Sequence, residues 1–451
     1  MRCEPPARRD VSHLLSMAVP RYTSYPTAPH FSDAVGEREY RAWLGALPLD
    51  HPVSLYLHVP FCRQLCWYCG CNMKLAARYA PVAAYVETLL AEIDLLADAL
   101  SGRMSVSHLH WGGGTPTALE PDDLERVMAR VSERFDLLHA AEVAIEGDPR
   151  TLTREMIERI GTLGFNRVSF GVQEFDPAVQ RAINRVQPAE MVAECVAALR
   201  GAGIPGINFD LIYGLPKQSV ATLERTVEQC LAMTPDRVAL FGYAHVPWVA
   251  KKQRLIDEAS LPGSAQRLAQ AEAASAAFIA GGFEQIGIDH FAAPGDPMAV
   301  AHRAGTLRRN FQGYTTDGAT TLLGLGASSI GRTPSGYAQN RTETGAYARD
   351  VESGRLPVGK GIALTADDRR RARVIEAIMC YGRVDLGTGD GPPHWWRDAL
   401  PALDDLAKDG VALLTGQVVT VPEEHRALRR VVAAAFDRYR AQSAVRHSVA
   451  V

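Results

Sequence analysis

The chain has 451 residues, of which 47% are hydrophobic and 22% are charged, with a formal net charge of −3. This length allows two or three domains, and the composition is that of an ordinary globular protein with a large core. The small net charge gives no basic surface that would favour nucleic acid. The sequence contains no apolar run of about 18 residues, so no membrane span is predicted.

The amino terminus and the cysteines predict where the protein works. The first ten residues, MRCEPPARRD, lack the apolar segment of a signal peptide. Four of the eight cysteines are clustered, whereas Cys3, Cys195, Cys230 and Cys380 are scattered. Scattered cysteines are usually small buried side chains, and this usage fits a reducing compartment. We therefore expect a cytoplasmic protein.

Residues 1–50 show too little periodicity for a domain, and we expect them to form an arm that wraps the rest of the fold. From residue 54 to about residue 291, short apolar runs alternate with segments of helical spacing. Such repeated units predict a parallel α/β barrel, complete or partial, although composition alone also allows a doubly wound sheet. The predicted strands are 54–59, 107–111, 142–147, 167–172, 206–213, 237–243 and 285–290. The predicted helices include 80–96, 119–135, 188–199 and 220–233.

The most informative segment, CRQLCWYCGC, follows the first predicted strand and runs from Cys62 to Cys71. Three cysteines spaced C-x3-C-x2-C on one short loop (Cys62, Cys66 and Cys69) can hold three irons of a [4Fe–4S] cluster. The fourth iron then stays open to bind a small molecule. A zinc site with Cys71 as the fourth ligand is the alternative, although structural zinc sites usually draw two ligand pairs from separated segments.

Polar or glycine-rich segments follow the next predicted strands. In a parallel barrel, functional groups gather at the carboxyl ends of the strands. The run GGGTPT at residues 112–117 lets the backbone approach a ligand, unless it is only a tight turn. Glu146 and Asp148 end the third strand, with helix capping as the ordinary alternative for Asp148. Gln173, Arg185 and Asp210 continue this series, and together they predict one site.

Near residue 364 the pattern changes to a small, mostly helical domain, which we place at residues 364–451. Residues 365–380, 395–409 and 422–439 are predicted helices, 387–393 a turn region, and 411–421 a hairpin around Gly416. Residues 441–451 are expected to fray. A winged-helix shape can bind DNA, but without a basic patch a lid over the barrel fits better.

The cysteine spacing with Tyr68 before the third cysteine resembles the radical S-adenosylmethionine (SAM) enzymes. Four further motifs make the chain similar, from about residue 20 to about residue 438, to the oxygen-independent coproporphyrinogen III oxidases of haem biosynthesis. These motifs are RYTSYPTA at 21–28, Cys71 with Asn72, HWGGGTPT at 110–117 and NFQGYTT at 310–316. The resemblance implies a partial (β/α)6 radical SAM barrel at residues 51–363, one [4Fe–4S] cluster and two SAM molecules.

The resemblance also assigns residues, position by position. Cys62, Cys66 and Cys69 match the cluster ligands, and Cys71 is expected to shape the loop without binding iron. Tyr56 and Glu146, which match contacts of the cluster-bound SAM, are the candidate catalytic residues. Gly113 and Ile330 match further contacts of that SAM. The second SAM is matched by Tyr68, Gly114, Thr115, Gln173, Arg185, Asp210 and Ala244. Another family member has phenylalanine in place of Tyr68, which keeps the ring.

The implied reaction begins when the reduced cluster cleaves SAM to methionine and a 5′-deoxyadenosyl radical. That radical removes a hydrogen from the carbon β to a propionate carboxyl of coproporphyrinogen III. Loss of carbon dioxide and one electron leaves a vinyl group, and two such conversions give protoporphyrinogen IX. The expected partners are this substrate and a flavodoxin- or ferredoxin-like electron donor, with no nucleic acid, and the chain is expected to be a monomer. Arg21, Arg308 and Arg309 are candidates for the substrate carboxylates.

Three other functions remain open from the sequence. A related haem-trafficking protein binds haem without decarboxylation, but such relatives typically lack the YTSYP motif and the fourth cysteine, which this chain has. A radical SAM methyltransferase or cyclopropane-forming enzyme would use two SAM molecules differently. A non-enzymatic zinc module is the third, and metal analysis distinguishes it.

Overall fold

The computed structural model describes residues 11–388, 392 and 394–440, and its largest element is a twelve-stranded sheet. Seven neighbouring strands, in the order β13-β1-β4-β5-β6-β7-β8, are all parallel. Six of them belong to successive β/α units, which confirms the partial (β/α)6 barrel. The parallel strands are β1 (Val53–Val59), β4 (Ser105–Gly113), β5 (Asp136–Gly147), β6 (Arg167–Gln173), β7 (Gly206–Tyr213), β8 (Arg237–Gly242) and β13 (Leu322–Leu325).

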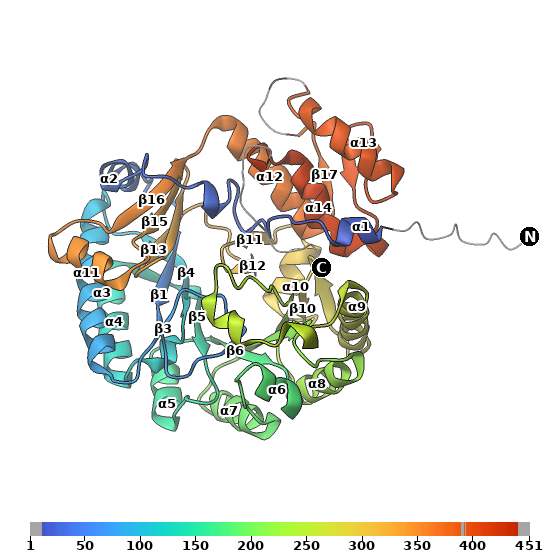
Figure 1. Cartoon of the computed structure of the whole chain (residues 1–451). Coiled ribbons are helices and arrows are strands. Elements are labelled where there is room, and N and C mark those ends of the chain that lie inside the picture. Colours follow the sequence, from blue (N-terminus) through green and yellow to red (C-terminus); the bar gives the residue numbers. More distant parts are fainter. Residues whose placement is uncertain (1–10, 389–391, 393, 441–451) are drawn as a thin grey trace, which may run out of the picture.

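Helices cover the outer face of this curved sheet, and the remaining strands extend both of its edges (Figure 1). The covering helices are α3 (Ala80–Ala99), α4 (Pro121–Arg134), α5 (Arg154–Thr162), α7 (Ala189–Gly201), α8 (Val220–Ala232) and α9 (Ser264–Ala280). The short helix α6 (Pro177–Ala182) packs in a separate apolar cluster that includes Trp67 and Tyr68. The antiparallel edge strands are β9 (Glu284–Ile286), β10 (His290–Ala292), β14 (Ile330–Thr333), β15 (Gly336–Asn340) and β16 (Val358–Ala363). Smaller elements are β2 (Phe61–Cys62), β3 (Lys74–Leu75), β11 (Arg308–Asn310), β12 (Gly313–Thr315), α10 (Pro297–Arg303) and α11 (Thr344–Glu352).

The prediction of a single seventh strand at residues 285–290 is wrong. The chain reverses inside that range and forms the antiparallel pair β9 and β10, of which β10 pairs with β8. The reversal is fixed by a distant residue, because the backbone N–H of Ile288 donates to the Tyr314 hydroxyl at 3.0 Å. A local apolar pattern contains no information about such a contact.

The carboxyl-terminal elements pack around a second hydrophobic core, and the amino-terminal arm contributes to it. Leu14, Val19, Tyr22 and Tyr25 of the arm are buried together with side chains of residues 374–436. Figure 1 shows the arm running across to these elements. They are α12 (Ala366–Tyr381), β17 (Arg383–Asp385), α13 (Leu400–Lys408), β18 (Leu413–Thr415), β19 (Val418–Thr420) and α14 (Arg429–Ala433). The arm itself contains α1 (Ser12–Leu15) and α2 (Glu37–Gly45).

The predicted helix at 365–380 and the hairpin around Gly416 are confirmed by α12 and by the pair β18 and β19. The predicted long helix at 422–439 is wrong, since this range contains only α14 and two short 3-10 turns, Glu423–Leu428 and Ala434–Phe436. Arg426 and Arg429 donate from it to the Gly287 carbonyl, so contacts with the barrel edge shape the segment.

Part of the turn region 387–393 and the tail 441–451 lie outside the described residues. Among the described helices, none combines the length and the apolar character that crossing a membrane requires.

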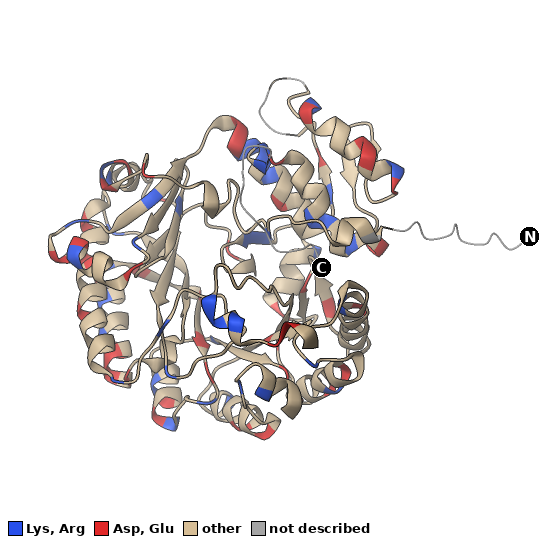
Figure 2. Cartoon of the chain, viewed as in Figure 1, with Lys and Arg blue, Asp and Glu red and all other residues tan. Residues whose placement is uncertain are grey.

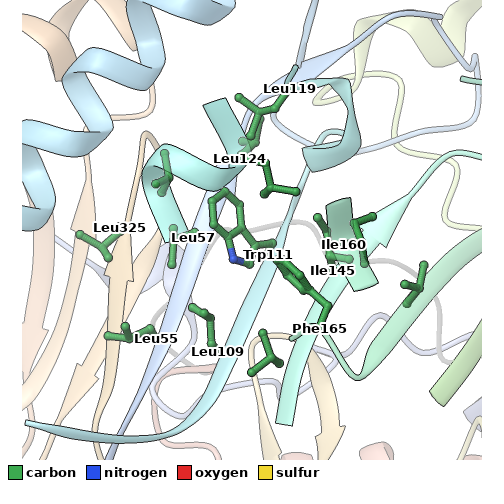
Figure 3. Packing of buried hydrophobic residues seen from close by; sticks show 14 of the residues in the cluster. Leu55, Leu57, Leu109, Trp111, Leu119, Leu124, Ile145, Ile160, Phe165 and Leu325 are labelled. Carbon is green, nitrogen blue, oxygen red and sulfur yellow. The ribbon is translucent and has the colours of Figure 1, made fainter. Parts of the chain in front are cut away.

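Trp111 on β4 is the largest fully buried side chain of the barrel core. Its ring lies 6.4 Å from that of Phe165, and Figure 3 shows Leu57 and Phe165 close to it. Burial of an indole of this size contributes several kcal/mol to folding because a truncation leaves a cavity that the close-packed neighbours cannot fill.

We expect Trp111→Ala to lower the free energy of unfolding by about 3–5 kcal/mol, measured by urea denaturation. Trp248→Ala is the matched control, because Trp248 is 50% exposed and should change the free energy of unfolding by no more than about 0.5 kcal/mol. Equal effects of the two substitutions would contradict the position of Trp111 in the core.

Candidate active site

The cysteine loop begins where β1 ends, and contacts from several units of the barrel hold it in place. The short strands β2 and β3 pair across the two ends of the loop. The backbone N–H of Trp67 donates to the Ile183 carbonyl at 3.0 Å, and Asn184 Nδ2 donates to the Leu65 carbonyl at 2.7 Å. The loop is therefore held against the segment that follows α6.

Each of the three predicted cluster ligands receives hydrogen bonds at its sulfur. Thr115 Oγ1 donates to Cys62 Sγ at 3.4 Å, and the backbone N–H of Cys71 donates to Cys69 Sγ at 3.4 Å. The guanidinium groups of Arg150 and Arg185 donate to Cys66 Sγ at 3.3 and 3.4 Å. These donors suit thiolate ligands, and hydrogen bonds to sulfur tune the potential of an Fe–S cluster.

Cys71 differs from the other three cysteines of the loop because it is exposed. Its thiol also donates a hydrogen bond to Cys69, which lowers the pKa of Cys69 to about 6, whereas burial raises the pKa of Cys62 to about 11. In the described part of the chain, no three His, Cys, Asp or Glu side chains are grouped so that they could hold one metal ion.

The glycine run after β4 lies directly against the cysteine loop. The N–H groups of Gly114 and Thr115 donate to the carbonyls of Val59 and Phe61, each at 2.8 Å. A Cβ at residue 114 would lie 2.6 Å from the Phe61 carbonyl oxygen, and residue 113 has a φ of +112°. Only glycine allows this close approach and this backbone conformation. The run is therefore more than a tight turn.

Four side chains on β1, β4 and β5 form a polar layer beside this loop. Tyr56 stacks on His110 with ring centroids 5.9 Å apart, and its hydroxyl lies 3.0 Å from His58 Nδ1. Glu146 lies 3.4 Å from His110 Nε2 and accepts the backbone N–H of Gly113 at 3.2 Å. Burial raises the pKa of Tyr56 well above its ordinary value, so it is a neutral hydrogen-bonding group.

Arg185 and Asp148 form a buried cluster next to Cys66. Arg185 is 6% exposed, lies 3.4 Å from Asp148 and donates to the Gly171 carbonyl at 2.5 Å. Arg150 pairs with the other oxygen of Asp148 at 2.6 Å. Asp148 therefore holds two guanidinium groups, and the capping alternative is wrong, because the helix that follows is capped by Thr153. The buried Nε of Arg185 has no partner among the described residues.

The remaining predicted site residues lie at strand ends or in loops near the cysteine loop. Gln173 ends β6 with a φ of +65°, and its amide lies beside Gly171. Gln253 Nε2 donates hydrogen bonds to the backbone carbonyls of Tyr68 and Ala244, at 2.7 and 3.0 Å. Ile330 begins β14, which returns antiparallel to β13 and so starts at the edge of the sheet where the cysteine loop lies.

Asp210 differs from these residues because it faces the interior of the barrel. It lies within β7 and faces an interior cavity of about 240 Å³ that His110, Glu146 and Ser169 also line. Burial, followed by the charge of Glu146, raises the pKa of Asp210 to about 7. The Ser169 hydroxyl donates to Asp210 at 3.4 Å. A carboxyl with this pKa gains or loses its proton near neutral pH.

Sequence reasoning did not select His58, His110, Arg150 and Ser169. A signal for the first two was present, since Tyr56 and His58, like His110 and Gly112, are two residues apart on strands and point to one face. Arg150 and Ser169 had no comparable signal, because their roles depend on Cys66, Asp148 and Asp210, which are distant in the sequence.

Comparisons with known proteins show which family this chain resembles. Residues 56–230 match the model of the radical SAM superfamily. The chain is 50% identical over 438 residues to the oxygen-independent coproporphyrinogen III oxidase of Bradyrhizobium diazoefficiens, covering 96% of this chain and 97% of the relative. The enzyme of that name from Escherichia coli is 40% identical over 430 residues, covering 94% of each chain. A solved structure of the Escherichia coli coproporphyrinogen III oxidase, described as a radical SAM enzyme, superimposes with a TM-score of 0.88 at 39% identity, covering 93% of this chain and 97% of that one.

The raised pKa of Asp210 predicts a pH-dependent stability. The folded-state pKa of Asp210 lies above the ordinary value of 3.8. The contribution of Asp210 to the free energy of unfolding is therefore fully present below pH 3.8, and it is lost as the pH rises through about 7. We expect the free energy of unfolding of Asp210→Asn, relative to wild type, to rise between about pH 4 and pH 7 by at most roughly 1.4 kcal/mol per pH unit. Urea denaturation of the reduced apoprotein at pH 5 and pH 7.5 measures this difference, and parallel pH profiles of the two proteins would refute it.

Proposed function

The chain belongs to the oxygen-independent coproporphyrinogen III oxidases of the radical SAM superfamily, and from this membership we propose how its residues carry out the reaction. It is an oxidoreductase of haem biosynthesis that uses a [4Fe–4S] cluster and SAM. It converts two propionate side chains of coproporphyrinogen III to vinyl groups without oxygen, which gives protoporphyrinogen IX. The observation that carries the proposal is the cysteine loop held against the glycine run at the carboxyl ends of β1 and β4.

Cys62, Cys66 and Cys69 are proposed to hold the cluster, with Cys71 outside its ligand set. The hydrogen bonds from Thr115, Arg150 and the Cys71 backbone to the three sulfurs support this arrangement. The positive charges of Arg150 and Arg185 beside Cys66 also fit a group made of several thiolates. When bound, the reduced cluster and SAM together supply the one-electron chemistry that removes a hydrogen atom from the substrate propionate.

Tyr56, Gly113, Glu146 and Ile330 are proposed to contact the SAM bound to the cluster. The Glu146 carboxylate offers an acceptor for an ammonium or a ribose hydroxyl, and its contacts with His110 and the Gly113 N–H orient it. Tyr56 presents a neutral hydroxyl and an aromatic face in the same layer. We propose Tyr56 and Glu146 as the catalytic residues because both would touch this cofactor.

A second SAM is proposed to lie on the other side of the cysteine loop. Its contacts would be Tyr68, Gly114, Thr115, Gln173, Arg185, Asp210 and Ala244. In support, Arg185 is a buried cation with an unpartnered Nε that suits a carboxylate, and Gln253 ties the backbones of Tyr68 and Ala244 together. Asp210 could accept a hydrogen bond from a hydroxyl or an ammonium of the ligand.

Three further properties are proposed from the family resemblance. Residues 1–50 act as an arm, residues 51–363 as the catalytic barrel and residues 364–451 as a covering domain, which fits the separate hydrophobic core at residues 374–436. The electron donor is a flavodoxin- or ferredoxin-like protein. The chain acts as a monomer.

The activity is tested by an anaerobic assay of reconstituted protein with coproporphyrinogen III, SAM and a reductant, read out as vinyl product. We expect about four irons and four sulfides per chain. Cys62→Ala, Cys66→Ala and Cys69→Ala should each lose both the iron and the product. Cys71→Ser should keep the iron while changing the activity. Stoichiometric zinc in protein kept free of oxygen, or loss of iron in Cys71→Ser, would contradict the proposed ligand set.

The second SAM site is tested by Arg185→Ala. Loss of a charge-assisted contact costs about 1.5–3 kcal/mol, which weakens binding roughly ten- to a hundredfold. Labelled SAM should then bind at about one per chain instead of two, and vinyl formation should fall while SAM cleavage persists. Arg225→Ala is the matched control, because Arg225 is 59% exposed and pairs only loosely with Asp176 at 3.5 Å. Iron content must stay normal in both variants, and two bound SAM in Arg185→Ala would rule out its assignment.

A further inference from the structure

A cavity of about 500 Å³ lies where the arm, β11, β14 and α12 meet. It adjoins the interior cavity that contains Glu146 and Asp210, since Asn310, Thr315 and Asp317 line both. A ligand in the larger cavity can therefore extend one edge toward the proposed reaction site. The sequence suggested Arg21, Arg308 and Arg309 for the substrate carboxylates. Arg308 and Arg309 line this cavity, whereas Arg21 lines a different one.

The wall of this cavity has a large excess of positive charge. It contains six arginines but only two carboxylates, Asp317 and Glu376. Figure 2 shows this basic colour on β11 and on the beginning of α12. The arginines are Arg308, Arg309, Arg332, Arg369, Arg370 and Arg373.

The two carboxylates do not neutralise most of these arginines. Asp317 accepts a hydrogen bond from the Ser54 hydroxyl and lies beside His108. Glu376 pairs with Arg308 at 3.3 Å and accepts the backbone N–H of Arg309 at 2.9 Å. Within residues 11–388, 392 and 394–440, the side chains of Arg332 and Arg373 have neither a hydrogen bond nor an ion pair.

Other arginines of the cavity also keep free hydrogen-bonding capacity. Among the residues that the structure describes, the Arg369 side chain donates only to the backbone carbonyls of Pro334 and Leu364. Arg309 stacks on Tyr314 at 4.4 Å, and its buried Nη1 has no partner among the described residues. Clustered arginines repel one another unless an anion lies between them, and their planar groups suit carboxylates in particular.

Aromatic and apolar side chains also line the wall, together with small polar ones such as Ser24 and Thr333. Tyr22, Tyr25, Phe311, Tyr337 and Ile375 line it, and the rings of Phe311 and Tyr337 meet edge to face at 5.7 Å. An apolar wall with a few cationic groups suits a flat ring system that has carboxylates on its rim. This combination distinguishes the cavity from a site for a small inorganic anion.

We propose that this cavity binds the tetrapyrrole by the propionate carboxylates on the edge that is not reacting, with Arg332 and Arg373 as two of the groups that contact them. This inference rests on the proposed function, since it takes coproporphyrinogen III as the ligand. Propionates lie around the whole rim of the tetrapyrrole. When one edge enters the interior cavity, the propionates of the opposite edge need a second binding site. The larger cavity with its six arginines, here called the arginine cavity, binds that opposite edge and so determines which propionates face Glu146.

The test compares two double variants of equal charge change. Arg332→Gln/Arg373→Gln removes the two unpaired cations of the cavity. Arg154→Gln/Arg383→Gln is the control. These exposed arginines on α5 and β17 lie outside the cavity, and their side chains have neither a hydrogen bond nor an ion pair in the described part of the chain. The probe is coproporphyrin III, which has the same four carboxylates and is followed by its fluorescence.

We expect the Kd for coproporphyrin III and the KM for coproporphyrinogen III to rise at least tenfold in Arg332→Gln/Arg373→Gln, and neither to change in the control. Iron content and SAM cleavage without substrate should match wild type in both. Arg332→Lys/Arg373→Lys, which keeps the charges, should recover part of the affinity. An unchanged Kd and KM in the Gln variant would overturn the proposal. Absence of vinyl product from the wild type would instead refute the proposed function, while the Kd comparison would still test the cavity.

Discussion

The site depends on the close backbone contact between the cysteine loop and the glycine run. The parallel pairing of β1 with β4 continues past both strands, so that Gly114 and Thr115 donate to Val59 and Phe61. Because a Cβ at residue 114 would collide with the Phe61 carbonyl, this contact exists only with glycine there. In the same contact, the Thr115 hydroxyl donates to Cys62 Sγ and the Gly113 N–H donates to Glu146. These hydrogen bonds link the proposed sulfur ligands to β5.

Buried charges fall into two kinds in this fold. In the interior of the barrel, Arg167 and Arg237 are held between Glu142 and Asp296, and although burial opposes it, the two arginines hold the pKa of Glu142 at about 2. These four groups compensate one another, as a structural ion-pair network requires. Asp210 faces the same interior cavity, and its carboxyl accepts the Ser169 hydroxyl but has no ion-pair partner among the described residues. Burial and the charge of Glu146 therefore raise its pKa. Such uncompensated groups mark ligand sites more reliably than buried charge alone.

The amino-terminal arm connects the barrel to the second core. The Tyr22 hydroxyl donates to Asp437 at 2.9 Å, and the N–H of Arg438 donates to the Tyr25 hydroxyl at 3.2 Å. Further along, Ser32 pairs with Gly361 at the edge of β16, and Tyr40 and Leu44 pack into the barrel core. The arm thus contributes its tyrosines to the wall of the arginine cavity and fixes the carboxyl-terminal elements beside the open side of the sheet.

The sequence by itself determined the repeated β/α units, the cysteine loop and the glycine run, because apolar periodicity and ligand spacing are local properties of the chain. It could not determine the reversal at Ile288 or the broken segment at 422–439, since Tyr314 and the Gly287 carbonyl are distant partners. Only the tertiary structure brought Arg150 and Arg185 to Cys66, paired Asp148 with both, and buried Asp210 beside Glu146. Charge compensation and desolvation are set by neighbours from other strands, so a linear pattern cannot encode which arginines stay unpaired.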